Sequence, residues 1–226
     1  MIKAKINDIF VSIQGEGKFV GDFQCFVRFL DCNLSCKFCD TKISTYTEFT
    51  PDELISKIKE AIGKTDVKTI SITGGEPLLY RDFLLEFLPR LKSGGFKIYL
   101  ETNGVLCDEL FDLIDNIDIV SMDIKLPSST LDRPLWREHE EFLKVAKRKN
   151  VFIKVIICVE TTLEDFKKAV DIAFRIYPEV TFILQPNTNQ LGKELTDKLL
   201  EFKIYSRQYL INTKVIPQVH KLIGVK

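Results

Sequence analysis

Short apolar, β-rich runs recur along the chain, and stretches with helical spacing of apolar residues lie between them. Seven of these runs are predicted strands: Gln24–Leu30, Thr69–Thr73, Lys97–Glu101, Ile117–Asp123, Val151–Ile157, Thr181–Gln185 and Lys214–Pro217. Six intervening stretches are predicted helices: Asp52–Ile62, Phe83–Leu91, Glu109–Asp115, Leu135–Lys149, Leu163–Tyr177 and Lys193–Tyr205. Strands that alternate with helices indicate an α/β fold with a mostly parallel sheet.

Two of the predicted helices begin with residues that usually cap a helix. Thr50-Pro51-Asp52 precedes the first helix, and Thr161-Thr162 precedes the fifth. The stretch Pro127–Pro134 is the most loop-like in the chain, and we expect it to be a surface connection. The sequence contains no internal repeat, low-complexity tract or long linker, so residues 1–226 are expected to form one domain.

The strand count limits the architecture, because seven strands are too few for a full eight-unit barrel. We therefore expect a partial, open (β/α) barrel with about six core parallel strands. In such sheets the chemistry collects at the carboxyl ends of the strands. The informative segments fall there: Asp31–Thr41, Gly74–Pro77, Thr102–Gly104 and Ser121–Lys125. These segments are expected to face one cavity.

The charge composition points away from a polyanionic partner. Lys and Arg total 32, and so do Asp and Glu, so no net field draws the molecule to nucleic acid or to an anionic membrane. Apolar runs are interrupted, as where Lys154 splits one of them, and none reaches the ~20 residues of a spanning helix. The first residues lack an apolar signal core. We expect a cytoplasmic protein.

The six cysteines are unevenly distributed, since three of them lie within residues 32–39. In a reducing cytoplasm this crowding indicates metal binding rather than a set of disulfides. Cys25, Cys107 and Cys158 are scattered in apolar surroundings. These three are expected to be small buried hydrophobic residues.

Cys32, Cys36 and Cys39 have the spacing C-x3-C-x2-C. Three thiolates on one tight loop can hold three corners of a cubane iron–sulfur cluster and leave the fourth iron without a protein ligand. That iron can bind the amino and carboxylate groups of S-adenosylmethionine, whose reductive cleavage releases a 5′-deoxyadenosyl radical. A zinc site in a regulatory or interaction module is a competing interpretation. It needs a distant fourth ligand, because His139 and His220 are far from the cysteines in sequence.

This spacing, with Phe38 directly before the third cysteine, resembles the defining motif of the radical S-adenosylmethionine superfamily. Gly74-Gly75-Glu76-Pro77 resembles the glycine-rich motif of the same superfamily, although such a sequence is also an ordinary strand-to-loop turn. Glycines lack Cβ atoms, so Gly74 and Gly75 permit close backbone approach. The two motifs together predict a 4Fe–4S cluster and S-adenosylmethionine as cofactors.

Nearly from end to end, the chain resembles the 7-carboxy-7-deazaguanine synthase family. The matching segments are Ile9–Gly17, Phe26–Phe29, Leu184–Pro186 and Val215–Gly224. The resemblance implies a carbon–nitrogen lyase that converts 6-carboxy-5,6,7,8-tetrahydropterin to 7-carboxy-7-deazaguanine and releases ammonia. This ring contraction lies on the route to 7-deazapurine nucleosides such as queuosine. The resemblance also implies hydrogen abstraction from C6 of the pterin and regeneration of S-adenosylmethionine.

The resemblance implies roles for individual residues. The substrate residues would be Ile13, Gln14, Gly15, Glu16, Arg28, Thr73, Gln218 and His220. The S-adenosylmethionine residues would be Phe38, Asp40, Gly75, Glu101, Asn103, Ser121, Asp123 and Lys125. Thr41 resembles the magnesium-binding threonine of the family, and a hydroxyl plus a substrate carboxylate suits Mg²⁺.

Several of these residues also have structural interpretations from the sequence alone. Thr41 can be a turn residue, Glu101 a strand-end cap and His220 a structural histidine, and Glu16 can serve only to orient the Gln14 loop.

The guanidinium of Arg28 is a natural partner for the pterin carboxylate.

One segment departs from the family pattern. Many members have Ser-Pro-Lys at the fourth strand, whereas this chain has Ser121-Met122-Asp123-Ile124-Lys125. Asp123-Ile124-Lys125 also resembles the Asp-x-Lys of glycyl-radical activating enzymes, which is the alternative function kept open. A flavodoxin or ferredoxin electron donor and a homodimer are expected by resemblance.

Overall fold

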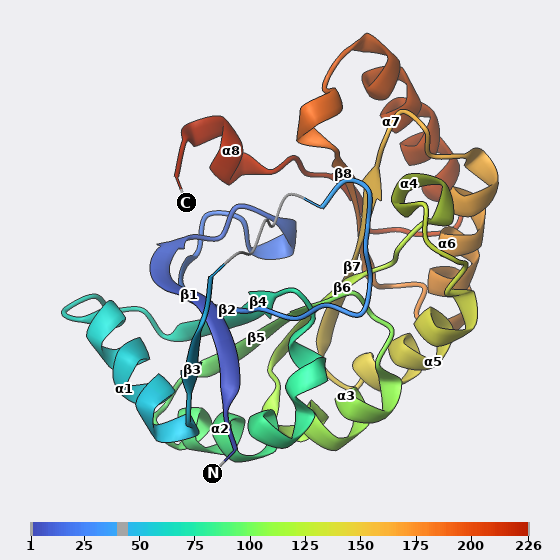
Figure 1. Cartoon of the computed structure of the whole chain (residues 1–226). Helices are drawn as coiled ribbons and strands as arrows, with labels where there is room; N and C mark the ends of the chain where they lie inside the picture. The colour runs from blue at the N-terminus through green and yellow to red at the C-terminus, as the bar shows by residue number, and fades with distance from the viewer. Residues whose placement is uncertain (1, 40–44, 226) are drawn as a thin grey trace.

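The centre of the molecule is a nine-stranded sheet in the order β3-β1-β2-β4-β5-β6-β7-β8-β9 (Figure 1). The structure is a computed structural model that describes residues 2–39 and 45–225. The strands are β1 (Ala4–Ile13), β2 (Phe23–Phe29), β3 (Thr47–Phe49), β4 (Thr69–Gly74), β5 (Lys97–Thr102), β6 (Ile119–Asp123), β7 (Asn150–Ile157), β8 (Thr181–Pro186) and β9 (Thr213–Val215). β2 and β4 to β9 are parallel, whereas β1 is antiparallel to β2 and β3.

The sheet is open, because β3 and β9 lie at its two edges. This arrangement confirms the expected α/β fold and the partial, open (β/α) barrel. Each of the seven predicted strands corresponds to one of the parallel strands. β1 and β3 were not predicted. β1 lacks a clear alternation because most of its residues are partly buried, and β3 is a short edge strand.

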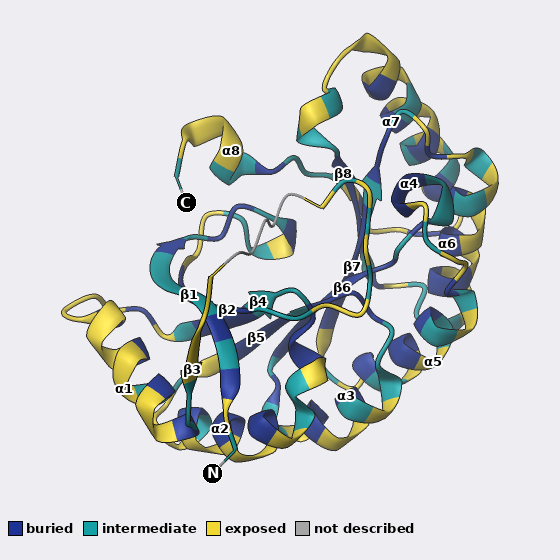
Figure 2. Cartoon of the chain, viewed as in Figure 1, coloured by how far each residue is buried: buried dark blue, intermediate teal, exposed yellow. Residues whose placement is uncertain are grey.

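The larger helices follow one another along the outer face of the curved sheet (Figure 1). They are α1 (Pro51–Ile62), α2 (Arg81–Ser93), α3 (Cys107–Leu113), α5 (Trp136–Ala146), α6 (Leu163–Ile176) and α7 (Lys193–Ser206). Two shorter helices are α4 (Pro127–Thr130) and α8 (Val219–Ile223), and single 3-10 turns are η1 (Gly17–Phe19), η2 (Pro77–Tyr80), η3 (Ile114–Asn116) and η4 (Thr188–Gln190). Buried residues line the helix faces toward the sheet, and exposed residues face outward (Figure 2). Among the described helices, none is long and apolar enough to cross a membrane.

Both predicted helix starts are confirmed by their hydrogen bonds. The Thr50 side chain accepts a hydrogen bond from the Glu53 backbone, and the Glu53 side chain accepts one from the Thr50 backbone, which completes a capping box on α1. The Thr162 side chain accepts a hydrogen bond from the Asp165 backbone at the start of α6.

Two expectations about local environment were wrong in part. The stretch Pro127–Pro134 is not simply a surface connection, because it begins with α4, where Ser129 and Thr130 are buried. Their polar groups are paired internally: the Ser129 hydroxyl lies 2.6 Å from that of Thr161, and the Thr130 carbonyl accepts from Lys37 N. Cys25 and Cys158 are buried as expected, but Cys107 is only partly buried at the start of α3.

The concave face of the sheet has two layers of side chains. Tyr99, Ile119, Phe152 and Ile183 form a small apolar floor, against which Phe19 and Ile216 pack. Two residues further along each strand the inward side chain is polar, since alternate residues of a strand share one face. These polar residues are Glu101, Ser121, Lys154 and Gln185. The strands therefore place a polar layer above a closed apolar floor.

The glycine pair after β4 brings that strand's end against the cysteine loop. Gly74 has a φ of 125°, and a Cβ there would lie 2.2 Å from the carbonyl oxygen of Phe29. A Cβ on Gly75 would lie 2.1 Å from the carbonyl oxygen of Asp31. The approach is sealed by hydrogen bonds from Gly75 N to Phe29 O and from Glu76 N to Asp31 O, at 3.0 and 2.7 Å. The glycines thus fix the start of the cysteine loop.

We predict that Gly75→Ala destabilises the protein by about 1–3 kcal/mol, because the new methyl group meets backbone atoms that cannot rotate away. The measurement is the free energy of unfolding in denaturant. Gly192→Ala is the matched control, because a Cβ there would have no atom within 4 Å. Equal stability of the two variants would contradict the backbone contact.

Candidate active site

A cavity of about 770 Å³ lies at the carboxyl ends of the parallel strands. The predicted site residues that line it are Ile13, Gln14, Gly15, Glu16, Arg28, Cys32, Cys36, Phe38, Cys39, Thr73, Gly75, Glu101, Asn103, Ser121, Asp123, Lys125, Gln218 and His220. Two further predicted residues, Asp40 and Thr41, lie outside the described residues. The structure therefore brings every predicted site residue that it describes to one cavity.

The three motif cysteines lie on the loop that follows β2. Cys39 N donates a hydrogen bond to Cys36 O at 3.0 Å, which closes a tight turn between them. Burial raises the pKa of the Cys36 thiol to about 11, and the nearby Lys125 ammonium opposes this effect. Within residues 2–39 and 45–225, no three His, Cys, Asp or Glu side chains are placed to hold one metal ion. The donor set fits a cubane cluster, which takes one thiolate at each of three irons.

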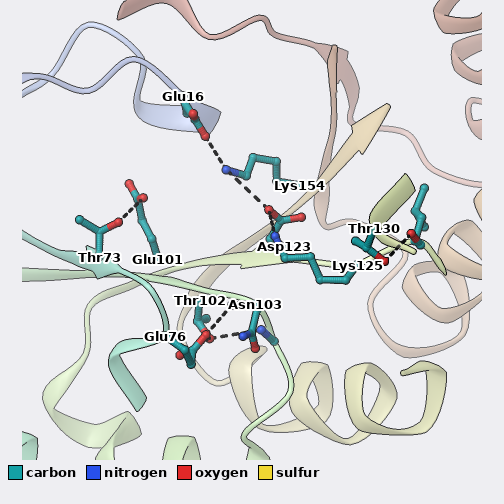
Figure 3. Close-up of polar contacts among 12 residues, drawn as sticks. Glu16, Thr73, Glu76, Glu101, Thr102, Asn103, Asp123, Lys125, Thr130 and Lys154 are labelled. Carbon is teal, nitrogen blue, oxygen red and sulfur yellow. Dashed lines mark hydrogen bonds and ion pairs between the residues drawn. The ribbon is translucent and has the colours of Figure 1, made fainter. Parts of the chain in front are cut away.

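Glu76 fixes the loops behind the cysteines (Figure 3). Its fully buried carboxylate accepts hydrogen bonds from Leu78 N, from Asn103 N at 2.7 Å and from the Thr102 hydroxyl at 2.9 Å. Burial raises the pKa of Glu76 to about 7, although these hydrogen bonds act in the opposite direction. The Asn103 amide also donates to the Asn33 side chain at 2.7 Å. The loops after β4 and β5 and the cysteine loop therefore form one connected frame.

Glu101 connects the loop after β1 to β4. Its carboxylate accepts a hydrogen bond from the Gln14 amide at 2.9 Å. It accepts another from the Thr73 hydroxyl at 2.8 Å (Figure 3). The side-chain Oε1 of Gln14 in turn accepts from Glu16 N at 3.0 Å. Glu101 on β5 therefore links the loop after β1 to β4 through side-chain hydrogen bonds. The alternative prediction from sequence, a strand-end cap, does not describe these contacts.

Arg28 carries a positive charge to the cavity from β2. Its guanidinium lies over the Phe10 ring, 5.4 Å from the centroid, and Phe10 stacks on Phe26 at 5.1 Å. The Phe10 ring, itself packed on Phe26, orients the guanidinium. A guanidinium held in this way suits a planar carboxylate ligand.

The C-terminal segment packs against the loop after β1. Val219 N donates to Gly15 O at 2.8 Å, and the Gln218 amide donates to the Glu16 carboxylate at 2.7 Å. The Thr188 hydroxyl donates to the side-chain Oε1 of Gln218 at 2.7 Å. This packing places His220, from the other end of the chain, beside the Gln14 loop at the cavity wall.

A chain of alternating charges crosses the cavity from Glu16 to Lys125 (Figure 3). The Lys154 ammonium lies 2.5 Å from Glu16 and 3.9 Å from Asp123, and Lys125 lies 2.8 Å from Asp123. Burial alone would raise the pKa of Glu16, but Lys154 and the Gln218 hydrogen bond outweigh it and lower that pKa to about 2. Lys125 also lies over the Phe38 ring at 5.4 Å from its centroid, beside the cysteine loop.

Several buried polar atoms at the cavity lack a hydrogen-bond partner among the described residues. They are Oδ1 of Asn103, Oδ1 of Asp123, and both amide atoms of Gln185. Buried polar groups are normally paired, so these atoms mark places for polar groups of a ligand. S-adenosylmethionine offers ammonium, carboxylate and ribose groups, and the residues present therefore fit it.

Three residues with a place in this arrangement were missed from sequence. Lys154 and Gln185 line the cavity, and each is a polar residue inside an apolar strand, which was the available signal. His139 is fully buried behind the cavity, where its Nε2 accepts from Lys125 N at 3.0 Å and its Nδ1 lies 3.0 Å from Gly104 O. Its sequence context carried no signal of this role.

Comparisons with known proteins identify the superfamily. The sequence model of the Radical SAM superfamily matches residues 27–189. The chain is therefore a radical S-adenosylmethionine enzyme, a class whose 4Fe–4S cluster and S-adenosylmethionine match the cysteine loop and the polar cavity.

Relatives at the sequence level define the family more closely. A 7-carboxy-7-deazaguanine synthase from Geobacter sulfurreducens is 36% identical, with 98% of this chain and 97% of the relative covered. Another from Methanothermobacter thermautotrophicus is 32% identical, with 100% and 99% covered. This chain belongs to the 7-carboxy-7-deazaguanine synthase family, whose members are carbon–nitrogen lyases.

Solved structures support the fold. The crystal structure of QueE from Escherichia coli has a TM-score of 0.68 at 21% identity and covers 97% of this chain and 96% of its own. Streptococcus suis SuiB bound to S-adenosylmethionine has a TM-score of 0.58 at 18% identity and covers 82% and 48%.

We predict that the His139 ring stays neutral down to about pH 4, because burial lowers its pKa from 6.5 to about 4. The unfolded chain takes up this proton between pH 6.5 and 4 while the folded protein does not, so His139 makes stability fall as pH falls through that window. Ring nitrogen chemical shifts against pH measure this directly. His220→Gln leaves His139 as the only histidine for assignment, and an imidazolium at pH 6 would contradict the prediction.

Proposed function

We propose that the chain converts 6-carboxy-5,6,7,8-tetrahydropterin to 7-carboxy-7-deazaguanine with release of ammonia. The observation that carries the proposal is that one cavity joins the three motif cysteines to Arg28 and to the Gln14–Glu101 hydrogen bond. The cavity, at about 770 Å³, lies within the range of small-molecule sites. Family membership supports the same reaction, since the relatives carry the synthase name.

Cys32, Cys36 and Cys39 would hold the cluster, and the residues around them would hold S-adenosylmethionine. When bound there, the cluster and S-adenosylmethionine would supply a 5′-deoxyadenosyl radical, which is the chemistry that the proposed hydrogen abstraction from C6 of the pterin requires. Gly75 and Asn103 are hydrogen-bonded to the β2 end and to the cysteine loop, through Phe29 O and the Asn33 side chain, and Asp123 is paired with Lys125 at the same cavity; these three are proposed for S-adenosylmethionine. The remaining residues proposed for S-adenosylmethionine are Phe38, Asp40, Glu101, Ser121 and Lys125.

The pterin would lie toward the loop after β1. Arg28 would bind its carboxylate, because a guanidinium and a carboxylate form charge-assisted hydrogen bonds. The Gln14 amide is already paired with Glu101, and Gln14 N, Gln14 O and Gly15 O also have partners within the protein, so the remaining backbone groups of residues 13–15 are the proposed partners for the pterin edge. Thr73, Glu16, Gln218 and His220 complete the proposed substrate residues.

Other features of the proposal come from the resemblance. Thr41 would bind Mg²⁺ together with the substrate carboxylate, since a hard cation prefers oxygen ligands. The chain would act as one radical S-adenosylmethionine domain over residues 1–226, as a cytoplasmic homodimer reduced by a flavodoxin or ferredoxin. Product would feed 7-deazapurine synthesis.

The two alternatives receive no support from the relatives described above. Those relatives are synthases, and none of them is a glycyl-radical activating enzyme. A zinc-binding interaction module is set aside because the chain belongs to the radical S-adenosylmethionine superfamily.

We predict that the anaerobically reconstituted, reduced protein forms the deazaguanine carboxylate from S-adenosylmethionine, Mg²⁺ and 6-carboxytetrahydropterin. Product is followed by mass spectrometry. Cys36→Ala should give none, because the cluster loses a ligand, while Cys158→Ala, at a buried cysteine outside the motif, should retain product formation. Omission of Mg²⁺ tests the Thr41 site. Release of 5′-deoxyadenosine without the deazaguanine product would overturn the substrate assignment and leave the radical chemistry standing.

A further inference from the structure

Lys154 is a buried cation inside an otherwise apolar strand. It lies on the inward face of β7, between Phe152 of the apolar floor and Ile156 of the cavity wall, and its residue is 9% exposed. A buried ammonium is costly unless it is paired with opposite charge. An apolar residue at position 154 would pack without that cost. Packing alone therefore does not explain why a lysine is present there.

The contacts of Lys154 join two halves of the cavity. Its ammonium lies 2.5 Å from Glu16 Oε2, on the loop after β1, and 3.9 Å from Asp123 Oδ2, at the end of β6. The second oxygen of Glu16 accepts from Gln218, at 2.7 Å. Both carboxylate oxygens of Glu16 are therefore oriented by fixed partners on other segments.

The position of Glu16 makes this orientation important. Glu16 belongs to a loop rather than to the sheet, and Lys154 on β7 contacts its carboxylate at hydrogen-bond distance. The same loop carries the backbone groups proposed for the pterin edge. Glu16 directly follows Gln14 and Gly15 in the chain. A displacement of the Glu16 carboxylate would therefore also move these two residues.

We propose that Lys154 is a positioning residue for the substrate: its ammonium holds the Glu16 carboxylate ionised and in place, and ties the pterin side of the cavity to Asp123 on the S-adenosylmethionine side. This inference rests on the proposed function. Lys154 acts through Glu16 and Asp123.

The charges around Glu16 determine how the stability of a Lys154 variant should depend on pH. The titratable groups that share the cavity or its floor with Glu16 are Lys154, Asp123, Lys125, Glu101, Tyr99, Arg28, His220, Lys221 and the thiols of Cys32, Cys36 and Cys39. With Lys154 present the pKa of Glu16 is about 2, so Glu16 is ionised in the folded and unfolded chain between pH 4.5 and 7. Without Lys154, burial raises the pKa of Glu16, and the folded protein then holds a proton that the unfolded chain releases. Stability should then fall as pH rises through this window.

The experiment compares Lys154→Met and Lys154→Arg with wild type, and uses Lys64→Met, at an exposed lysine, as the matched control. In reconstituted enzyme, Lys154→Met is expected to raise KM for 6-carboxytetrahydropterin by about 30-fold or more, because the partner charge is left buried and unpaired. The effect on kcat should be smaller, and KM should rise further as pH falls. Lys154→Arg should have a KM close to that of wild type, and this KM should not depend on pH in the same way.

A second measurement needs no cofactor. The melting temperature of the full chain is followed from pH 4.5 to 7, and the deficit of Lys154→Met against wild type should grow with pH. The double variant Glu16→Gln/Lys154→Met should lose this growth, because the titrating group is removed.

The outcomes separate this inference from the proposed function. Absence of deazaguanine product from wild type would refute the proposed function and the substrate role of Lys154, while the melting data still test the Lys154–Glu16 pair. Normal product formation with an unchanged KM in Lys154→Met would overturn the positioning role alone. A pH-dependent deficit that persists in the double variant would assign the effect to another carboxylate and would also overturn it.

Discussion

Charge buried away from water must be paired, and the pairing of Glu16, Lys154, Asp123 and Lys125 is the constraint on which the site depends. The four residues come from the loop after β1, from β7 and from the end of β6. Gln218 extends the series to the C-terminal segment. Segments distant in sequence are therefore held around one cavity by charges that none of them could bury alone.

The sheet makes this arrangement possible through its two inward layers. Tyr99, Ile119, Phe152 and Ile183 close the floor, and the next inward residues are polar because alternate strand positions share a face. The Gly74–Gly75 backbone packs on the cysteine loop, and Glu76 ties that frame to β5. The start of the cysteine loop is consequently fixed at the edge of the polar layer.

Local patterns predicted the parallel strands, the larger helices and the cysteine loop, because each depends on neighbouring residues. The cavity residues were predicted through strand ends and family resemblance. What escaped prediction depends on distant partners: Lys154 meets Glu16 across 138 residues, and Gln218 meets it across 202. β1 was not predicted, because buried and exposed residues do not alternate clearly along it. α4 was not predicted, because hydroxyl-rich segments are usually exposed, whereas Ser129 is buried and paired with Thr161.

The central claim is that the cysteine loop holds a cluster with one iron open to S-adenosylmethionine inside this cavity. The most direct test is the electron paramagnetic resonance spectrum of the reduced, reconstituted protein before and after addition of S-adenosylmethionine. The account predicts a reduced 4Fe–4S signal whose g values change when S-adenosylmethionine binds the open iron. A 4Fe–4S signal that saturating S-adenosylmethionine leaves unchanged would contradict it.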